Sequence, residues 1–121
     1  MSKRILVIED QEDNRRIMRD LLTSVGYELI EAVTGEEGVS SAEVHIPDLI
    51  LMDIQLPGID GYETTRRIKA NSALQHIPII VVTSYALSGD DVKAYAAGCD
   101  GYVSKPFSPR ALLAKIREYV P

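Results

Sequence analysis

Apolar residues occur along the chain in short continuous blocks that alternate with longer segments of mixed character. Three blocks are four residues long and two are shorter; in chain order they are Ile5–Ile8, Leu29–Ile30, Leu49–Met52, Ile79–Val82 and Tyr102–Val103. Short runs rich in Ile and Val are typical of parallel strands that are covered on both faces. We therefore expect a five-stranded parallel sheet, with the first, third and fourth strands inside and the second and fifth at the edges.

The segments between the blocks have helical spacing and carry helix start and stop signals. Thr34 and Glu37 have the spacing of a capping box, and Ser108-Pro109 reads as an N-cap followed by proline at the first helical position. The first segment, Glu12–Val25, is followed by Gly26, a common helix terminator. The apolar residues that share one face of this segment are Ile17, Leu21 and Val25, with Leu22 beside them.

The two remaining segments complete a regular alternation of strands and helices. One follows Asp60-Gly61, and the other follows Ser88 and ends at Gly98. Five β-α units with right-handed connections form an open α/β fold, a doubly wound parallel sheet with helices on both faces.

Length and charge narrow the class of protein. A chain of 121 residues predicts one domain, which we expect to cover residues 1–121. The 13 Lys and Arg against 18 Asp and Glu leave a net charge of −5, which disfavours direct nucleic-acid binding. Cys99 is the only cysteine and excludes an internal disulfide. No apolar run is long enough for a signal peptide or a membrane span, so we expect a cytoplasmic protein without membrane contact.

Distinctive residues follow four of the five predicted strands, and three of them are carboxylates. In chain order these residues are Glu9 and Asp10, then Asp53, then Thr83 and Ser84, and finally Ser104, Lys105 and Pro106. Ligands of open α/β sheets bind at the carboxyl ends of the strands, so we expect these side chains to converge. Two carboxylates ~5 Å apart repel by about 3 kcal/mol at an effective dielectric constant of ~20. Lys105 supplies one neutralising charge, and Mg²⁺ bound by oxygen ligands is a natural second.

Each residue type leaves alternatives open when it is taken singly. Glu9 and Asp10 alone could form a solvated acidic rim. Asp53 could serve as a metal ligand, a base, or a nucleophile that forms an aspartyl phosphate. Thr83 could be an ordinary β-branched strand residue or a donor to a phosphoryl oxygen. Lys105 could be a plain surface lysine, although the following Pro106 offers a cis bond that fixes the loop.

Taken together, Glu9-Asp10, Asp53, Thr83 and Lys105-Pro106 resemble the motifs of response regulator receiver domains, the CheY-like domains of two-component signalling. The likeness covers the whole chain and implies the flavodoxin-like strand order 2-1-3-4-5. The stretches 47–57 and 98–106 look closest to single-domain regulators of the DivK type. They also resemble receivers attached to hybrid kinases, so a receiver excised from such a kinase remains an alternative.

The resemblance implies a phosphorelay function and a set of metal ligands. Asp53 would be the phosphoacceptor, receiving a phosphoryl group from a histidine kinase or a histidine phosphotransfer protein. Asp10 and Asp53 would bind Mg²⁺ directly, together with the backbone carbonyl of Gln55, and Glu9 would act through a metal-bound water. The domain would catalyse its own phosphorylation and dephosphorylation without being an enzyme that acts on other substrates.

The resemblance also implies a switch. Lys105 and Thr83 would contact the phosphoryl oxygens, and Thr83 and Tyr102 would move together. Ser84 is small, as access to the aspartate requires. Two further positions, Gln55 and Tyr85, would tune dephosphorylation, and we expect Tyr85 to crowd the attacking water.

Two surfaces are expected to carry the signal in and out. The output face would be the fourth helix, fifth strand and fifth helix, with Val92, Tyr95 and Tyr102 as candidate contacts to a downstream protein. The kinase would approach past the first helix and the last loop, where we expect exposed residues at Asn14, Arg15, Met18, Pro106 and Phe107. The protein would be a monomer, or a weak dimer on phosphorylation.

Three rival functions belong to different classes. A phosphohydrolase with Asp53 as its nucleophile usually needs a second acid two residues on and a substrate cap, but Gln55 stands there and no segment is long enough for a cap. A flavodoxin-like cofactor binder needs a phosphate-cradling first loop, and Glu9–Asn14 is acidic instead. A purely structural interaction module gives no reason for three acids and a lysine to converge.

Overall fold

The computed structural model describes residues 2–83 and 90–121. Within them, strands and helices alternate along the chain as β1 (Arg4–Ile8), α1 (Glu12–Ser24), β2 (Glu28–Ala32), α2 (Gly35–His45), β3 (Leu49–Met52), α3 (Gly61–Ala70), β4 (Ile79–Thr83), α4 (Asp90–Ala97), β5 (Gly101–Ser104) and α5 (Pro109–Arg117). All pairings are parallel and the strand order is β2-β1-β3-β4-β5. The expected doubly wound sheet, with β1, β3 and β4 inside it, is therefore confirmed.

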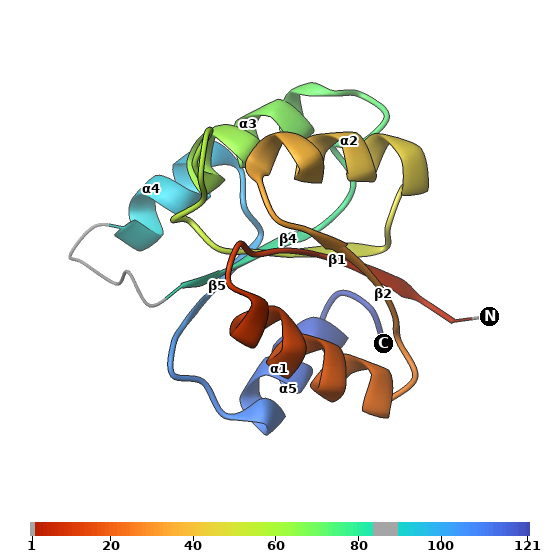
Figure 1. Cartoon of the computed structure of the whole chain (residues 1–121). Helices are drawn as coiled ribbons and strands as arrows, with labels where there is room; N and C mark the ends of the chain where they lie inside the picture. Colours follow the sequence, from red (N-terminus) through yellow and green to blue (C-terminus); the bar gives the residue numbers. More distant parts are fainter. Residues whose placement is uncertain (1, 84–89) are drawn as a thin grey trace.

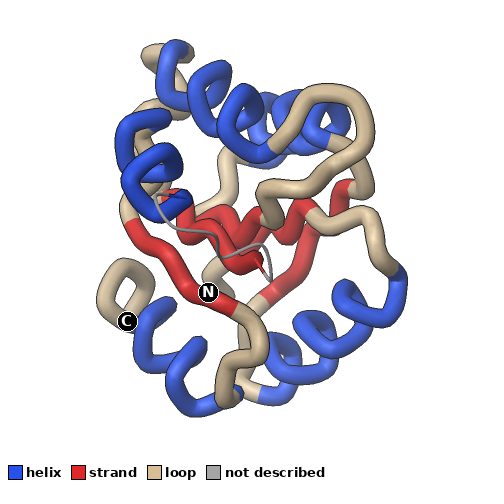
Figure 2. Tube along the Cα trace, turned by 90° about the vertical axis from the view of Figure 1, so that its left-hand side faces the viewer, coloured by secondary structure: helices blue, strands red, loops and turns tan. Residues whose placement is uncertain are grey.

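The sheet is the middle of three layers. Helices α2, α3 and α4 lie on one face, and α1 and α5 lie on the other (Figure 1). The view along the strands shows the same sandwich, with helices above and below the sheet (Figure 2). Both faces of the central strands are thus covered, which is why their sequences are continuously apolar rather than alternating.

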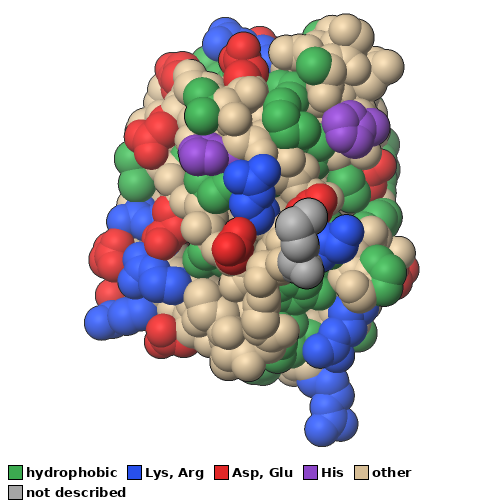
Figure 3. All heavy atoms as spheres, turned by 90° about the vertical axis from the view of Figure 1, so that its right-hand side faces the viewer, with side chains coloured by type: hydrophobic (Ala, Val, Ile, Leu, Met, Phe, Trp, Pro, Cys, Tyr) green, Lys and Arg blue, Asp and Glu red, His purple; other side chains and the backbone are tan. Residues whose placement is uncertain are grey.

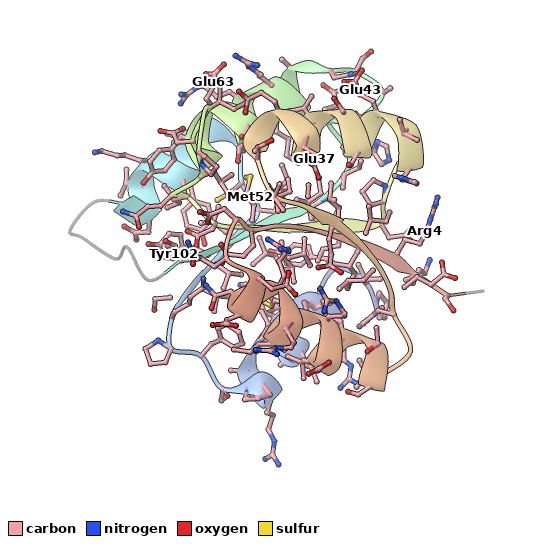
Figure 4. All side chains as sticks on the ribbon, in the orientation of Figure 1. Arg4, Glu37, Glu43, Met52, Glu63 and Tyr102 are labelled. Atoms are coloured by element: carbon pink, nitrogen blue, oxygen red, sulfur yellow. The ribbon has the colours of Figure 1, made fainter. Side chains whose placement is uncertain are left out.

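Alternate residues of each central strand enter two separate hydrophobic cores. In β1, Leu6 and Ile8 pack on the α2–α4 side, whereas Ile5 and Val7 pack on the α1–α5 side. Met52, at the end of β3, lies on the α2–α4 side of the sheet (Figure 4). These strand residues are at most 1% exposed, so the sheet is a rigid base for whatever follows its ends.

Helix starts and stops follow the sequence signals. The side chains of Thr34, Asp60 and Ser108 each accept a hydrogen bond from a backbone N–H three residues on, at 2.9–3.0 Å. Gly26 and Gly98 follow α1 and α4 with φ of +94° and +113°, a backbone conformation that glycine adopts without strain. The predicted N-cap of α4, Ser88, lies outside the described residues.

The prediction of which face of α1 is buried is wrong, because the buried stripe is shifted by about one residue from the expected one. Ile17 is 56% exposed and Val25 is 39% exposed, whereas Met18 and Leu22 are the buried residues of this helix. Successive helical residues are 100° apart, so the two stripes lie side by side and spacing alone does not rank them. Packing against the β1, β3 and α5 residues of the same core selects the second stripe. The expectation that Met18 is exposed is therefore also wrong.

Charged side chains at the amino ends of the strands are largely structural. Lys69 Nζ donates to Asp100 Oδ2 (3.0 Å) and to the carbonyls of Gln75 (3.1 Å) and Ile77 (2.8 Å). Acidic and basic side chains are interspersed on this face (Figure 3).

The remaining observations concern the single cysteine and the helix lengths. Burial raises the pKa of the Cys99 thiol to about 11. No helix of the described residues is long and apolar enough to cross a membrane.

The burial pattern of α1 predicts unequal costs for two similar substitutions. Leu22→Ala opens a cavity in the α1–α5 core and should lower the free energy of unfolding by about 2–5 kcal/mol. Ile17→Ala, on the same helix but exposed, should change it by about 0.5 kcal/mol or less. Urea unfolding of both variants measures the difference. Equal costs would contradict this assignment of the buried face.

Candidate functional site

Three charged side chains from distant parts of the chain meet at the carboxyl ends of the strands. Glu9 follows β1, Asp53 follows β3 and Lys105 follows β5. Lys105 Nζ lies 2.9 Å from Glu9 Oε1 and 3.2 Å from Asp53 Oδ2. One ammonium group therefore bridges two carboxylates that follow two neighbouring inner strands, as the strand-end pattern in the sequence leads one to expect.

The cluster is shielded from water, and its charges depend on one another. The side chains of Glu9, Asp53 and Lys105 are 5%, 11% and 15% exposed. Burial raises the pKa of Glu9, although the hydrogen bond and charge of Lys105 oppose the shift. Burial alone would lower the pKa of Lys105, but its hydrogen bonds and charge interactions with the two acids outweigh burial and raise it. The lysine therefore stays charged at neutral pH and offsets the carboxylate repulsion.

The sheet's backbone hydrogen bonds continue one step beyond the strands and hold these residues in place. The three bonds run from Glu9 N to the Ala32 carbonyl (3.0 Å), from Asp53 N to the Ile8 carbonyl (3.1 Å) and from Lys105 N to the Thr83 carbonyl (2.8 Å). Each residue is thus tied to a neighbouring strand at the point where its own strand ends. The Lys105–Pro106 peptide bond is cis, as the sequence analysis allowed.

Asp10 and Gln55 lie beside the cluster. Gln11 Nε2 donates to Asp10 Oδ2 at 3.2 Å, and the Gln55 backbone N–H donates to Asp53 Oδ1 at 3.2 Å. The two oxygens of Asp53 therefore have different partners, the Gln55 backbone on one side and Lys105 on the other.

The two expected switch residues lie on the neighbouring strands β4 and β5. Thr83 is the last residue of β4, is fully buried, and pairs with Ser104 of β5. Tyr102 lies on β5, half-buried, and packs against the α2–α4 core. Figure 4 shows Tyr102 towards the side of the molecule where the strands end, opposite Arg4. Ser84 and Tyr85 lie outside the described residues.

Gly61, the first residue of α3, was not singled out by the sequence analysis as part of the site. A Cβ atom there would lie 2.5 Å from the Asp53 carbonyl oxygen and 2.7 Å from the Ile54 Cα. The Gly61 N–H donates to the Ile54 carbonyl at 2.8 Å. Glycine is needed here because α3 packs directly on the backbone that carries Asp53. The sequence signal was the Asp60-Gly61 pair, which we interpreted only as a helix start.

Arg15 also has a role that its sequence position did not reveal. We expected an exposed docking residue, but its side chain is only 13% exposed. Its Nη1 donates to the Glu9 carbonyl at 2.9 Å, and the guanidinium also pairs with Glu12 and Glu31. The Glu12 pair lies within one turn of the helix, whereas contact with Glu9 depends on how α1 packs on the sheet.

The donor set fits a hard divalent cation that is completed by other ligands. Among residues 2–83 and 90–121, no three His, Cys, Asp or Glu side chains form a ready-made metal cluster. Mg²⁺ is commonly bound by only one or two carboxylates, with water and phosphate oxygens as its other ligands. The oxygen donors of Asp10 and Asp53 match that preference.

An apolar groove lies next to the charged cluster. Its volume is about 360 Å³ and it is lined by Asn14, Ile17, Lys105, Pro106, Phe107 and Pro109. The groove lies between α1 and the loop that connects β5 to α5. It accounts for the exposure of Ile17, which borders the groove instead of the core.

The doubly wound sheet in this strand order, with paired acids and a lysine at its carboxyl edge, defines the receiver class of signalling domains. The chain belongs to the response regulator receiver domain family, whose model matches residues 5–117. The polar-differentiation response regulator DivK of Brucella ovis is 42% identical over 120 residues, which cover 99% of this chain and 98% of that protein. The predicted resemblance to receiver domains, and to DivK in particular, is thereby confirmed.

Solved structures agree with this assignment. The receiver domain of a sensor histidine kinase from Pseudomonas aeruginosa PAO1 has a TM-score of 0.92 and 36% identity, covering 99% of this chain and 98% of that one. That crystal structure has a magnesium ion coordinated in its active site cleft. A CheY-like receiver domain protein from Methanospirillum hungatei JF-1 has a TM-score of 0.91 and 35% identity, covering 98% of this chain and 93% of that one.

The ion cluster predicts a stability cost when its cation is removed. Lys105→Met leaves two shielded carboxylates without a cation and should lower the free energy of unfolding by about 3 kcal/mol at neutral pH. The double variant Glu9→Gln/Lys105→Met should recover part of this loss. Urea unfolding in the presence of a metal chelator measures both.

The exposed Lys93 of α4 provides a matched control for this prediction. Lys93→Met should change the free energy of unfolding by about 0.5 kcal/mol or less. A Lys105→Met variant as stable as wild type, or a double variant no more stable than the single one, would show that the cluster contributes no net stability.

Proposed function

We propose that this protein is a phosphorelay response regulator that accepts a phosphoryl group on Asp53 from a histidine kinase or a histidine phosphotransfer protein. The observation that supports this most is the placement of the Asp53 carboxylate. It is 11% exposed and lies between Lys105 and the Gln55 backbone N–H, beside a second acid, in a domain of the receiver family. We further propose that residues 1–121 work as one domain in the cytoplasm.

In the proposed reaction, a carboxylate oxygen of Asp53 forms a bond to phosphorus. The bond between phosphorus and the donor histidine nitrogen breaks, and its electron pair returns to the imidazole. Phosphoryl transfer depends mainly on positioning and on stabilising charge at the phosphoryl oxygens. Lys105, held in place by Glu9, supplies a fixed positive charge, and Thr83 supplies a hydroxyl donor. The domain thus catalyses its own modification and is not an enzyme for other substrates.

Asp10, Asp53 and the Gln55 backbone carbonyl would hold Mg²⁺, with Glu9 acting through a bound water. When bound, Mg²⁺ neutralises the acids and the oxygens of the incoming phosphoryl group. The magnesium ion in the active site cleft of the Pseudomonas receiver domain supports this assignment. Lys105 alone offsets only part of the charge of Glu9, Asp10 and Asp53, so a second cation has a clear electrostatic role.

The switch follows from the change in charge. Phosphorylation replaces one negative charge on Asp53 by roughly two and adds acceptor oxygens. Thr83 would donate to one of them, and Tyr102 on the neighbouring strand would respond. The output face of α4, β5 and α5 would then engage a downstream protein, with Val92 and Tyr95 as exposed contacts at 66% and 48%. Gln55 and Tyr85 would set the lifetime of the phosphorylated state.

The decisive experiment combines the protein with Mg²⁺ and acetyl phosphate and looks for an acid-stable, base-labile phosphoryl adduct by mass spectrometry. Wild type should gain one phosphoryl group, and Asp53→Asn should lose more than about 90% of the adduct because its amide is not a nucleophile. Asp48→Asn, which changes the exposed aspartate directly before β3, at the opposite edge of the sheet, should be labelled like wild type.

Two outcomes would reject the assignment. An adduct of undiminished size in Asp53→Asn would place the modification elsewhere. Rapid multiple turnover of unrelated phosphoesters would favour the phosphohydrolase alternative, in which Asp53 is regenerated in each cycle.

We also propose that the apolar groove beside Lys105 receives the phosphodonor protein. A donor histidine must reach Asp53, and the groove lies at the rim of that site between α1 and the β5–α5 loop. Its exposed apolar residue Ile17 provides contact area without contributing to the core. Asn14, Pro106 and Phe107 keep the docking role expected from the sequence, whereas the buried Met18 does not.

Ile17→Glu tests this docking surface. Phosphorylation by acetyl phosphate should remain close to wild type, because the small donor needs no docking surface. Transfer from a phosphorylated histidine phosphotransfer domain should fall about tenfold or more, because a charge enters an apolar contact. Val44→Glu, at an exposed apolar residue of α2, should leave both rates unchanged. Equal losses with both donors would instead indicate damage to the site itself.

A further inference from the structure

Glu9 is anchored through both of its backbone polar groups. Its N–H donates to the Ala32 carbonyl of β2 at 3.0 Å, which continues the sheet ladder. Its carbonyl accepts from Arg15 Nη1 at 2.9 Å. The sheet therefore holds the peptide group that precedes Glu9, and Arg15 of the first helix holds the peptide group that joins Glu9 to Asp10.

Arg15 is itself held by two acids from different elements. Its Nη2 pairs with Glu12, one turn earlier on α1, and its Nε lies 3.4 Å from Glu31 Oε1 on β2. The planar guanidinium can bind several acceptors at once in a fixed geometry, which a lysine ammonium group does not reproduce. With a side chain only 13% exposed, Arg15 therefore connects α1, β2 and the end of β1 at a single point.

We infer that Arg15 is a positioning residue for the acidic pair Glu9-Asp10, and that its contact with the Glu9 carbonyl sets the Mg²⁺ affinity of the site. The inference rests on the proposed function, since it concerns the cation that Asp10 and Asp53 would hold. Groups that orient metal ligands from outside the coordination sphere commonly change metal affinity by about 10–100-fold when they are removed.

Two effects of removing Arg15 have opposite signs, and this makes the inference testable. If Arg15 acted only through its positive charge, its loss would make the acidic site more attractive to a cation. If it acts by holding the Glu9 carbonyl, its loss lets the Glu9-Asp10 backbone move, and cation binding weakens. Positioning therefore predicts lower Mg²⁺ affinity, and a charge effect alone predicts higher affinity.

Arg19 is a close internal control. It lies one turn further along α1 and pairs with the same two acids, through Nε and Nη2 with Glu31 (2.9 and 2.7 Å) and through Nη2 with Glu12 (3.5 Å). The bond to the Glu9 carbonyl comes from Arg15 alone of the two. Arg19→Met thus removes an equal charge and a comparable ion pair while leaving the Glu9 contact in place.

The experiment titrates Mg²⁺ into the metal-free proteins without phosphodonor and follows backbone amide shifts by nuclear magnetic resonance. The dissociation constant of Arg15→Met should rise about tenfold, and that of Arg19→Met should stay close to the wild-type value. Arg15→Lys keeps the positive charge and a donor group but loses the planar guanidinium that binds several acceptors at once. Its dissociation constant for Mg²⁺ should therefore lie between those of wild type and Arg15→Met. The spectra of the metal-free proteins show whether each variant is folded. If Arg15→Met is not folded, Arg15→Lys is the variant that tests the inference.

Phosphorylation by acetyl phosphate provides the second readout. In the folded Arg15 variants, the Mg²⁺ concentration for half-maximal rate should rise with the dissociation constant, while the rate at saturating Mg²⁺ stays close to wild type. Unchanged or tighter Mg²⁺ binding in these variants, or equal losses in Arg15→Met and Arg19→Met, overturns the inference and leaves the proposed function standing. A wild-type protein that binds no Mg²⁺ overturns both.

Discussion

The arrangement at the carboxyl ends of the strands depends on one interaction, in which a single lysine ammonium group bridges two shielded carboxylates. Lys105 reaches both Glu9 and Asp53, and the acids in turn hold the lysine in its charged form. Without such a partner, each acid would be an unpaired charge in a shielded position, which is strongly unfavourable. The sheet's register aligns Ile8 and Met52, the last residues of β1 and β3, with Tyr102, and β5 continues to Ser104 before Lys105. The meeting of the three side chains therefore depends on this register.

Much of the fold could be predicted because its strands are buried on both faces. That burial produces continuous apolar blocks, and block length separates the central strands from the edges. Helix caps can be predicted equally well, because the side chains of Thr34 and Ser108 accept hydrogen bonds from N–H groups only three residues away. The convergence of Glu9, Asp53 and Lys105 follows from the same logic, because residues that follow parallel strands share one edge.

The features that could not be predicted depend on how helices are rotated and how closely they approach the sheet. Two apolar stripes of α1 lie side by side, and only contact with the rest of the core selects Met18 and Leu22 over Ile17. The same rotation turns Arg15 inward to the Glu9 carbonyl. Gly61 shows the second limit, since nothing local in the sequence indicates that α3 touches the Asp53 backbone.

The two ends of the sheet carry charge clusters of different composition. At the amino end, within the part of the chain that the structure describes, Lys69 pairs with one acid, Asp100, and donates its other hydrogen bonds to backbone carbonyls. That pair joins one positive and one negative charge. At the carboxyl end, Lys105 pairs with two acids and Asp10 follows Glu9 in the chain, so negative charge exceeds positive charge there. This excess, held rigid by the strand ends, is the electrostatic basis for the Mg²⁺ site that we propose there.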